Sequence, residues 1–278
     1  MSVAQQALQD TGIPVEVYYA SEIDEYAMAV TQSNFPETIQ LGSVVDIKFT
    51  DTHDIDLLVG GSPCQDLSIA KKDREGLKGS RSGLFWEYVR IRDEIKPKYF
   101  ILENVASMPK EAKDTISEAL GVQPVMINAS LVSAQNRKRL FWVGKWNGEK
   151  YEQVEIPQPE DKGILLKDIL ESDVDEKYLS SQRVIDGVNK SNYQDRKPIK
   201  MDGKLRTLTI GGDVKRTIVN GVWRYLTPVE YLRGQSMPDD YFDKATYKNK
   251  PISNTQRYKM CGNAFNCEVI KWILLHLK

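Results

Sequence analysis

The most constraining feature of this 278-residue chain is a short apolar run, Asp56 to Val59, that stops at two glycines. The run is too short for a stable helix and is bounded by chain-breaking residues, which favours a buried β-strand. Gly60 and Gly61 allow a sharp turn, and the Ser-Pro-Cys sequence that follows predicts a turn with Cys64 at the rim of a sheet. Ligands bind at that rim in open α/β sheets, and a cysteine there can be a nucleophile. On this stretch alone, an inert buried or surface thiol stays the more common outcome.

Strand-like and helix-like patterns alternate up to about residue 146. The expected strands cover residues 15–23, 38–45, 56–59, 99–105, 125–132 and 140–146, and the expected helices cover residues 3–8, 24–35, 84–95 and 110–120. This alternation predicts an α/β fold with a doubly wound, mostly parallel sheet covered on both faces. We expect the last two strands to pair near the sheet edge.

The pattern changes after residue 146. Residues 147–222 are polar and turn-rich, which predicts a small second lobe, and residues 223–278 return to helical patterns that begin with a capping box at Thr227 to Glu230. The net charge is only −1, but residues 183–224 hold ten basic and four acidic side chains. Such a segment suits a phosphate backbone, with a solvated face as the alternative.

Composition limits the possible chemistry. The 41% hydrophobic and 28% charged residues are typical of soluble globular proteins, and we find no membrane-spanning run, so we expect no membrane contact. Cys64, Cys261 and Cys267 form neither a disulfide framework nor a zinc-like spacing, which favours a reducing compartment such as the cytoplasm. With only two histidines, a Ser-His-Asp triad or a His-rich metal site is not expected.

Three polar clusters follow predicted strands or precede the last one. They are Ser62-Pro63-Cys64-Gln65, Glu103-Asn104-Val105 and Gln135-Asn136-Arg137-Lys138-Arg139. Each has an ordinary alternative, such as a surface carboxylate or a solvated corner. In this order, with Glu22 at an earlier strand end, they resemble the cytosine carbon-5 DNA methyltransferases, as do the segments 224–230 and 262–264. The resemblance covers nearly the whole chain. It implies a Rossmann-like catalytic domain at 1–146, a variable target-recognition lobe at 147–222 and C-terminal helices at 223–278 that return to the catalytic domain.

The resemblance implies covalent catalysis on a cytosine flipped out of DNA. Cys64 would add its thiolate to carbon 6, and Glu103 would hold the ring nitrogen and amine as proton donor. Arg139, with Arg137 as a further candidate, would contact the carbonyl oxygen and a neighbouring phosphate.

The implied methyl donor is S-adenosylmethionine, with no metal. Glu22 would bind its ribose hydroxyls and Ile23 its adenine. Other residues expected at the cofactor pocket are Ser43, Val44, Pro63, Leu84, Asn263 and Ala264. The implied partner is double-stranded DNA, bound by a monomer in the cytoplasm of a bacterial or phage-infected cell. The residues expected at DNA are Gln65, Ser68, Lys71, Arg81, Thr207, Thr209, Gly211 and Gly212.

Two departures from the family pattern affect the donor site. The family begins with a strand and a glycine-rich turn, whereas this chain starts with residues 1–4 that resemble the tail of that turn, so we expect the first strand to be missing. Ser43 stands where the family usually has an aspartate. Two alternatives therefore stay open: a catalytically weak DNA-binding relative with an incomplete donor site, and an RNA cytosine methyltransferase.

Overall fold

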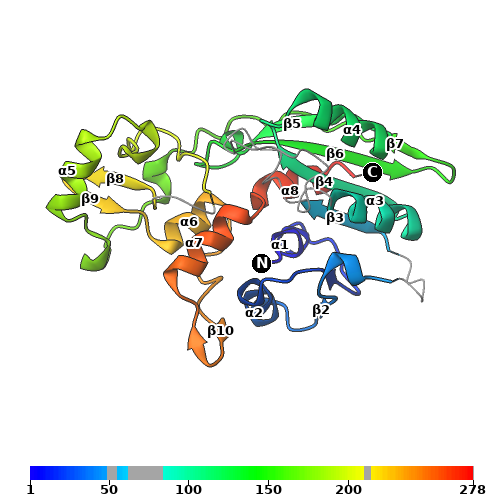
Figure 1. The fold of residues 1–278 in the computed structure, drawn as a ribbon, viewed down its shortest axis with the longest axis horizontal. Coiled ribbons are helices and arrows are strands. Elements are labelled where there is room, and N and C mark those ends of the chain that lie inside the picture. The colour runs from blue at the N-terminus through cyan, green and yellow to red at the C-terminus, as the bar shows by residue number, and fades with distance from the viewer. Residues whose placement is uncertain (49–54, 62–83, 210–213, 278) are drawn as a thin grey trace.

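The computed structural model describes residues 1–48, 55–61, 84–209 and 214–277, and Figure 1 shows their arrangement. The main element is a five-stranded sheet in the order β3-β4-β6-β5, with β7 paired to β6. Its strands are β3 (Leu57–Gly61), β4 (Tyr99–Val105), β5 (Pro124–Asn128), β6 (Lys138–Trp146) and β7 (Tyr151–Gln153).

Helices cover both faces of this sheet. Alternate residues of β4 point to opposite faces, so Phe100 and Leu102 belong to one core and Ile101 to another. The first core includes residues of α3 and α4, and the second includes residues of α1, α2 and α8. These helices are α1 (Val3–Asp10), α2 (Glu25–Asn34), α3 (Leu84–Ile95), α4 (Lys110–Leu120) and α8 (Cys267–Leu274). The layered arrangement confirms the α/β fold class.

The described strand pairs are mixed in direction, whereas the sequence pattern predicts a mostly parallel sheet. Strands β3 and β4 run parallel, but β6 runs antiparallel to β4, β5 and β7. The physical reason is the short link at 129–137, which includes η3 (Ala129–Leu131), because parallel neighbours need a longer crossover. The predicted pairing of the last two strands is confirmed, and β6 lies inside the sheet while β5 lies at its edge.

Two short strands in the N-terminal part of the chain lie outside this sheet. Strands β1 (Tyr19–Ala20) and β2 (Ile39–Gln40) pair in parallel with each other as a separate two-stranded sheet. Both are shorter than the predicted 15–23 and 38–45. The apolar residues Val15 and Val17 are 41% and 51% exposed, so the described structure provides little packing to extend β1 toward them. After β2 comes the short helix η1 (Val44–Asp46).

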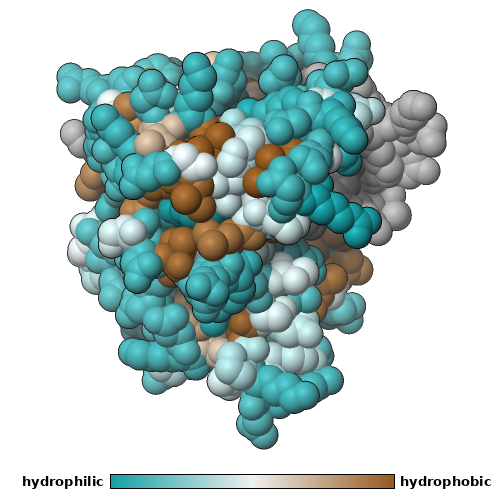
Figure 2. All heavy atoms as spheres, turned by 90° about the vertical axis from the view of Figure 1, so that its left-hand side faces the viewer, coloured by the Kyte–Doolittle hydropathy of each residue, from teal (hydrophilic) through white to brown (hydrophobic). Residues whose placement is uncertain are grey.

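The lobe lies to one side of the sheet and is built from short elements (Figure 1). They are η4 (Leu166–Ile169), η5 (Glu176–Tyr178), α5 (Gln182–Lys190), η6 (Gln194–Arg196), β8 (Arg216–Val219) and β9 (Val222–Tyr225). Figure 2 shows that the molecule is largely hydrophilic on this side, with apolar side chains gathered near the middle.

The C-terminal part returns from the lobe to the sheet. Its elements are α6 (Pro228–Gly234), β10 (Thr246–Tyr247), β11 (Lys250–Pro251), α7 (Asn254–Asn263) and α8. The capping box that the sequence predicts at Thr227 and Glu230 is confirmed at the start of α6. Among the described helices, none combines the length and apolar character needed to cross a membrane.

Candidate active site

Glu103 and Arg139 form an ion pair at the edge of the sheet where β3 ends. Nε of Arg139 lies 2.7 Å from Oε1 of Glu103, and the two side chains are only 16% and 12% exposed. Glu103 pairs with Gly61 of β3 on one side and Phe141 of β6 on the other. A charge-assisted contact between two such side chains fixes the direction of the carboxylate.

Gly61 allows an aromatic ring to pack beside this pair. A Cβ atom at residue 61 would lie 2.9 Å from the Phe265 ring and 3.6 Å from Oε2 of Glu103, so a side chain there would displace the ring. Phe265 directly follows the predicted cofactor residues Asn263 and Ala264. The end of β3, Glu103 and the C-terminal segment therefore converge at one point. The sequence analysis did not predict Phe265. The available signal was Gly61, the second of two consecutive glycines, because a glycine can indicate that another group packs closely against the backbone.

Eight of the predicted site residues lie outside the described residues, including the expected nucleophile. They are Cys64, Pro63, Gln65, Ser68, Lys71, Arg81, Gly211 and Gly212. Gly61 is the last described residue before Cys64, and it lies opposite Glu103 in the strand register.

The other two cysteines are poor nucleophiles. Cys261 and Cys267 are free thiols buried in the core. Burial raises the pKa of the Cys267 thiol to about 12, and burial also raises the pKa of Cys261. Because the thiolate is the reactive form, neither suits covalent catalysis near neutral pH.

The predicted donor-binding residues Glu22 and Ile23 lie between β1 and α2. Oε1 of Glu22 accepts hydrogen bonds of 2.9 Å from the backbone N–H groups of Ile23 and Asp24. The Ile23 side chain is 75% exposed. Asp24 caps α2 and pairs with Nζ of Lys259 on α7 at 2.7 Å. Partial burial opposes ionisation of Asp24, but the hydrogen bond and charge of Lys259, with two backbone N–H groups, lower its pKa.

The residues predicted after β2 lie beside this segment. The Ser21 hydroxyl donates to the Gly42 carbonyl at 2.9 Å, which joins the chain after β1 to the chain after β2. Ser43 caps η1, and the carbonyl of Val44 accepts from Arg90 of α3, the helix that begins at Leu84.

Asn263 and Ala264 follow on the C-terminal side. Asn263 ends α7 and is exposed, whereas Ala264 is buried. Lys259, four residues before Asn263 on the same helix, is the link to Asp24 that sequence reasoning missed.

Arg137 differs from Arg139 in its surroundings. It is only 4% exposed, and its guanidinium donates to the carbonyls of Leu208, Gly262 and Ala264. Of the two arginines that the sequence motif singles out, Arg139 is the one paired with Glu103. The predicted DNA residue Thr207 donates its hydroxyl to the Asn136 carbonyl at 2.6 Å, and Thr209 is exposed.

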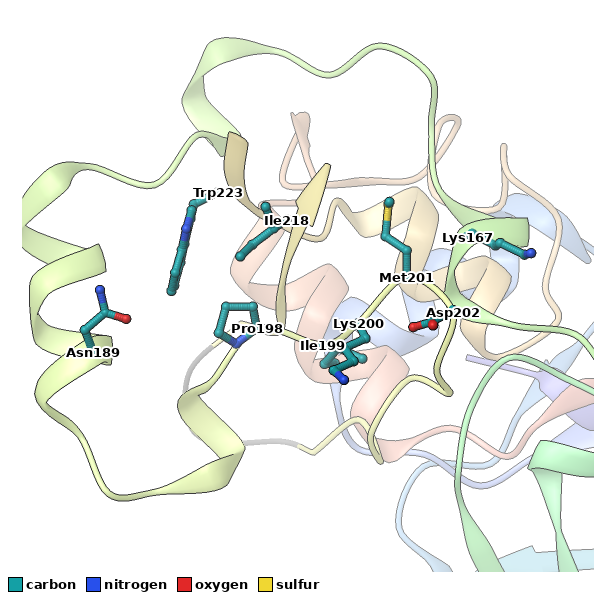
Figure 3. A pocket seen from close by; sticks show the side chains of 9 residues that line it. All are labelled: Lys167, Asn189, Pro198, Ile199, Lys200, Met201, Asp202, Ile218 and Trp223. Carbon is teal, nitrogen blue, oxygen red and sulfur yellow. The ribbon is translucent and has the colours of Figure 1, made fainter. Parts of the chain in front are cut away.

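A cavity of about 610 Å³ lies in the lobe and not at this sheet edge (Figure 3). Its apolar lining includes Ile218 and Trp223 of the β8–β9 hairpin, and none of the predicted site residues lines it. The described residues also hold no cluster of three or more His, Cys, Asp or Glu side chains suited to a metal ion.

Residues 3–206 match the family model of the C-5 cytosine-specific DNA methylases. The chain belongs to this family. It is 31% identical to the type II methyltransferase M1.ScrFI of Lactococcus lactis subsp. cremoris, over 90% of this chain and 69% of that protein. It is 27% identical to the type II methyltransferase M.HhaI of Haemophilus parahaemolyticus, over 98% of this chain and 89% of that protein.

Solved structures support the fold. The Schizosaccharomyces pombe Dnmt2 methyltransferase superposes with a TM-score of 0.75 at 18% identity, over 99% of this chain and 94% of that one. A putative DNA modification methyltransferase encoded within an Escherichia coli prophage gives a TM-score of 0.73 at 18% identity, over 99% and 95% of the two chains. The family assignment confirms the predicted enzyme class, a methyltransferase that acts on carbon 5 of cytosine in DNA.

Proposed function

We propose that this methyltransferase transfers a methyl group from S-adenosylmethionine to a flipped-out cytosine in double-stranded DNA through a covalent adduct with Cys64. The Glu103–Arg139 pair supports this proposal most strongly, because it lies beside Gly61, three residues before Cys64. A carboxyl group and a guanidinium held at one sheet edge can bind the ring nitrogen and the carbonyl oxygen of one pyrimidine.

The proposed reaction adds a thiolate to the cytosine ring, transfers a methyl group to it and then eliminates the thiolate. The Cys64 thiolate forms a bond to carbon 6, and the electron pair of the carbon 5–carbon 6 double bond makes carbon 5 nucleophilic. In its carboxylic acid form, Glu103 donates a proton to the ring nitrogen as the thiolate adds, and Arg139 donates hydrogen bonds to the carbonyl oxygen. S-adenosylmethionine, when bound, would supply the methyl group that carbon 5 accepts and would leave as S-adenosylhomocysteine. Transfer of the carbon-5 proton to a solvent water then re-forms the carbon 5–carbon 6 double bond and expels the Cys64 thiolate, while Glu103 takes back its proton from the ring nitrogen.

The described residues on the donor side fit S-adenosylmethionine. A carboxylate oriented by two backbone N–H groups, as in Glu22, is suited to a pair of ribose hydroxyls. The exposed Ile23 side chain offers an apolar surface to the adenine. Ser43 would offer the adenine amine a neutral hydroxyl instead of a carboxylate. The remaining proposed pocket residues are Val44, Pro63, Leu84, Asn263 and Ala264.

Target recognition is assigned to the lobe at residues 147–222, between a catalytic domain at 1–146 and the returning helices at 223–278. Its basic side chains and the segment at 207–212 would contact DNA, with further contacts from residues 65–81. We assign the chain to a reducing cytoplasm, because the buried Cys261 and Cys267 are free thiols, and we propose that it acts as a monomer.

The direct test is methyl transfer from tritiated S-adenosylmethionine to unmethylated DNA and, in parallel, to transfer RNA. We expect labelled 5-methylcytosine in the DNA and none with Cys64→Ser. Label in the transfer RNA alone would replace DNA by RNA as the substrate, and label in neither would contradict the proposed activity.

One observation favours a second function, DNA binding with weak catalysis. In the described residues, the β1–β2 pair next to Glu22 is not hydrogen-bonded to β3 next to Glu103. A donor site divided in this way would bind S-adenosylmethionine weakly. Calorimetry with S-adenosylhomocysteine distinguishes the two functions: binding supports the enzyme, and DNA binding without any heat from S-adenosylhomocysteine supports the second function.

A further inference from the structure

Arg137 joins two segments that are far apart in the sequence. Its Nη1 donates to the Leu208 carbonyl at 3.0 Å, and its Nη2 donates to the carbonyls of Gly262 and Ala264 at 3.2 and 2.9 Å. The side chain is buried, so these carbonyls replace water around a permanently charged group.

On the lobe side, Leu208 is held at both of its backbone polar groups. Its N–H donates to Oε1 of Gln135 at 3.0 Å, while its carbonyl accepts from Arg137. Leu205 pairs with Gln135 in a parallel bridge, so the lobe segment 205–208 runs beside the chain that carries both side chains. This segment leads directly into Thr209 and the residues proposed to contact DNA.

On the donor side, the two carbonyls bonded by Arg137 flank Asn263, which is exposed. Gln235 supports the same turn by donating to the carbonyls of Cys261 and Ala264, and it is itself hydrogen-bonded by Gln135 at 3.0 Å. Arg137 and Gln135 therefore both contact the recognition segment directly. Arg137 also bonds the donor segment directly, whereas Gln135 is connected to it through Gln235.

The energetics favour joint placement of the two segments. Burying a guanidinium is costly, and the hydrogen bonds that Nη1 and Nη2 of Arg137 donate to carbonyls offset part of that cost, so withdrawal of either segment removes hydrogen bonds from buried N–H groups. Order imposed on one segment therefore lowers the free-energy cost of ordering the other. Such coupling is reciprocal between the two binding sites.

We propose that Arg137 is a positioning residue that couples DNA recognition at 205–209 to donor binding at 262–264. The proposal rests on the proposed function for the identity of the two ligands. It gives Arg137 a role distinct from that of Arg139, which faces Glu103.

The test compares two variants that each remove hydrogen bonds from a cation to backbone carbonyls. Arg137→Lys keeps the charge but loses the planar fork that spans both segments. Lys204→Met is the matched control, because Lys204 donates to the carbonyls of Ser130, Ser133 and Ile164, and so ties the lobe to the catalytic domain without any hydrogen bond to 262–264.

The first measurement is the affinity for S-adenosylhomocysteine with and without saturating unmethylated phage DNA. We expect DNA to raise the wild-type affinity about tenfold, a typical coupling. This gain should fall below about twofold in Arg137→Lys and persist in Lys204→Met. An unchanged gain in Arg137→Lys, an equal loss in Lys204→Met, or no gain in the wild type would overturn the proposal.

The second measurement is amide hydrogen exchange of the protein alone. Arg137→Lys should lose protection in 205–209 and 261–266 together, whereas Lys204→Met should leave 261–266 protected. Preserved protection of either segment in Arg137→Lys would contradict the coupling. A wild type that binds no S-adenosylhomocysteine would refute the proposed function, and this exchange result would still decide whether Arg137 holds the two segments together.

Discussion

The sheet and the lobe are stabilised by different interactions. In the sheet, apolar side chains such as Phe100, Ile101 and Trp142 are fully buried between helices on both faces. In the lobe, basic side chains bind the chain's own carbonyls: Lys197 bonds Val188 and Asn189. The basic excess that favours phosphate binding in the sequence is therefore partly used inside the lobe. Local charge alone therefore overstates the number of basic side chains that are available to phosphate.

In the proposed function, the same division between sheet and lobe would separate chemistry from recognition. Glu103 and Arg139 are fixed on neighbouring strands of the sheet, where small displacements are costly. The lobe segments connect to the sheet through hydrogen bonds of Gln135, Arg137 and Lys204. If Glu103 and Arg139 act as proposed, this arrangement would let recognition vary while the two side chains keep their geometry.

The largest effect is expected from Glu103→Gln, which keeps the side chain's shape but removes its proton transfer and its charge pair with Arg139. Turnover should fall roughly 10²–10⁴-fold while DNA affinity stays within twofold. Single-turnover methylation and a DNA-binding titration check both values. A matching loss of DNA affinity would show that chemistry and recognition are not separated.

A matched pair of isoleucines tests the difference in packing. Ile101→Ala in β4 should cost roughly 4–5 kcal/mol, whereas Ile199→Ala in the lobe should cost about 2 kcal/mol. Both side chains are buried, but Ile199 already lines the 610 Å³ cavity and so loses fewer contacts. Urea unfolding measures both changes. Equal costs would mean that the lobe is packed as tightly as the sheet.

Salt dependence separates basic residues that bind DNA from those that bind the lobe. Arg183→Ala and Lys190→Ala remove exposed charges, and each should lower the slope of log affinity against log salt by about 0.9 if it loses one phosphate contact. Lys197→Ala should leave the slope unchanged and lower the urea midpoint, because its ammonium holds two carbonyls. An unchanged slope for Arg183→Ala and Lys190→Ala, together with a lower slope for Lys197→Ala, would mean that Lys197 binds DNA and the other two side chains do not.

The smallest effect concerns the Asp24–Lys259 contact on the donor side. The pKa of Asp24 is lowered in the folded protein, so its ionised form stabilises the fold above the unfolded pKa. That stability is lost as the pH falls through the folded pKa. Asp24→Asn keeps a good helix cap and should flatten this loss of stability as the pH falls below the ordinary Asp pKa of 3.8. An unchanged slope of urea midpoint against pH would exclude a contribution from Asp24.

The sequence predicted the parts of the sheet that have clear local signals. Helices α3 and α4 and strand β4 have their predicted bounds, because Pro97 and Pro109 interrupt the patterns and Gly121 ends α4 at a φ of +73°. Helix α5 was missed because its sequence is largely polar, and α7 was predicted only as part of the helical region 223–278, without bounds of its own. Strand β1 was predicted too long because its apolar alternation continues into residues that are exposed.

The candidate site was predictable to a similar extent. The sequence motif singled out Glu103 and Arg139, and the structure joins them in one ion pair. The contacts of Arg137 with residues 208, 262 and 264 were not predictable, because no local pattern encodes contacts between positions so far apart in the chain. The packing of Phe265 on Gly61 was not predictable for the same reason.

Trapping on DNA that carries 5-fluorocytosine tests the central claim most directly, because fluorine at carbon 5 blocks the final elimination. With S-adenosylmethionine present, we predict a covalent protein–DNA adduct that survives denaturation, maps to the peptide containing Cys64 and is absent in Cys64→Ser. A preparation that methylates ordinary DNA but forms no adduct, or forms one at Cys261 or Cys267, would contradict the proposed role of Cys64 beside Glu103.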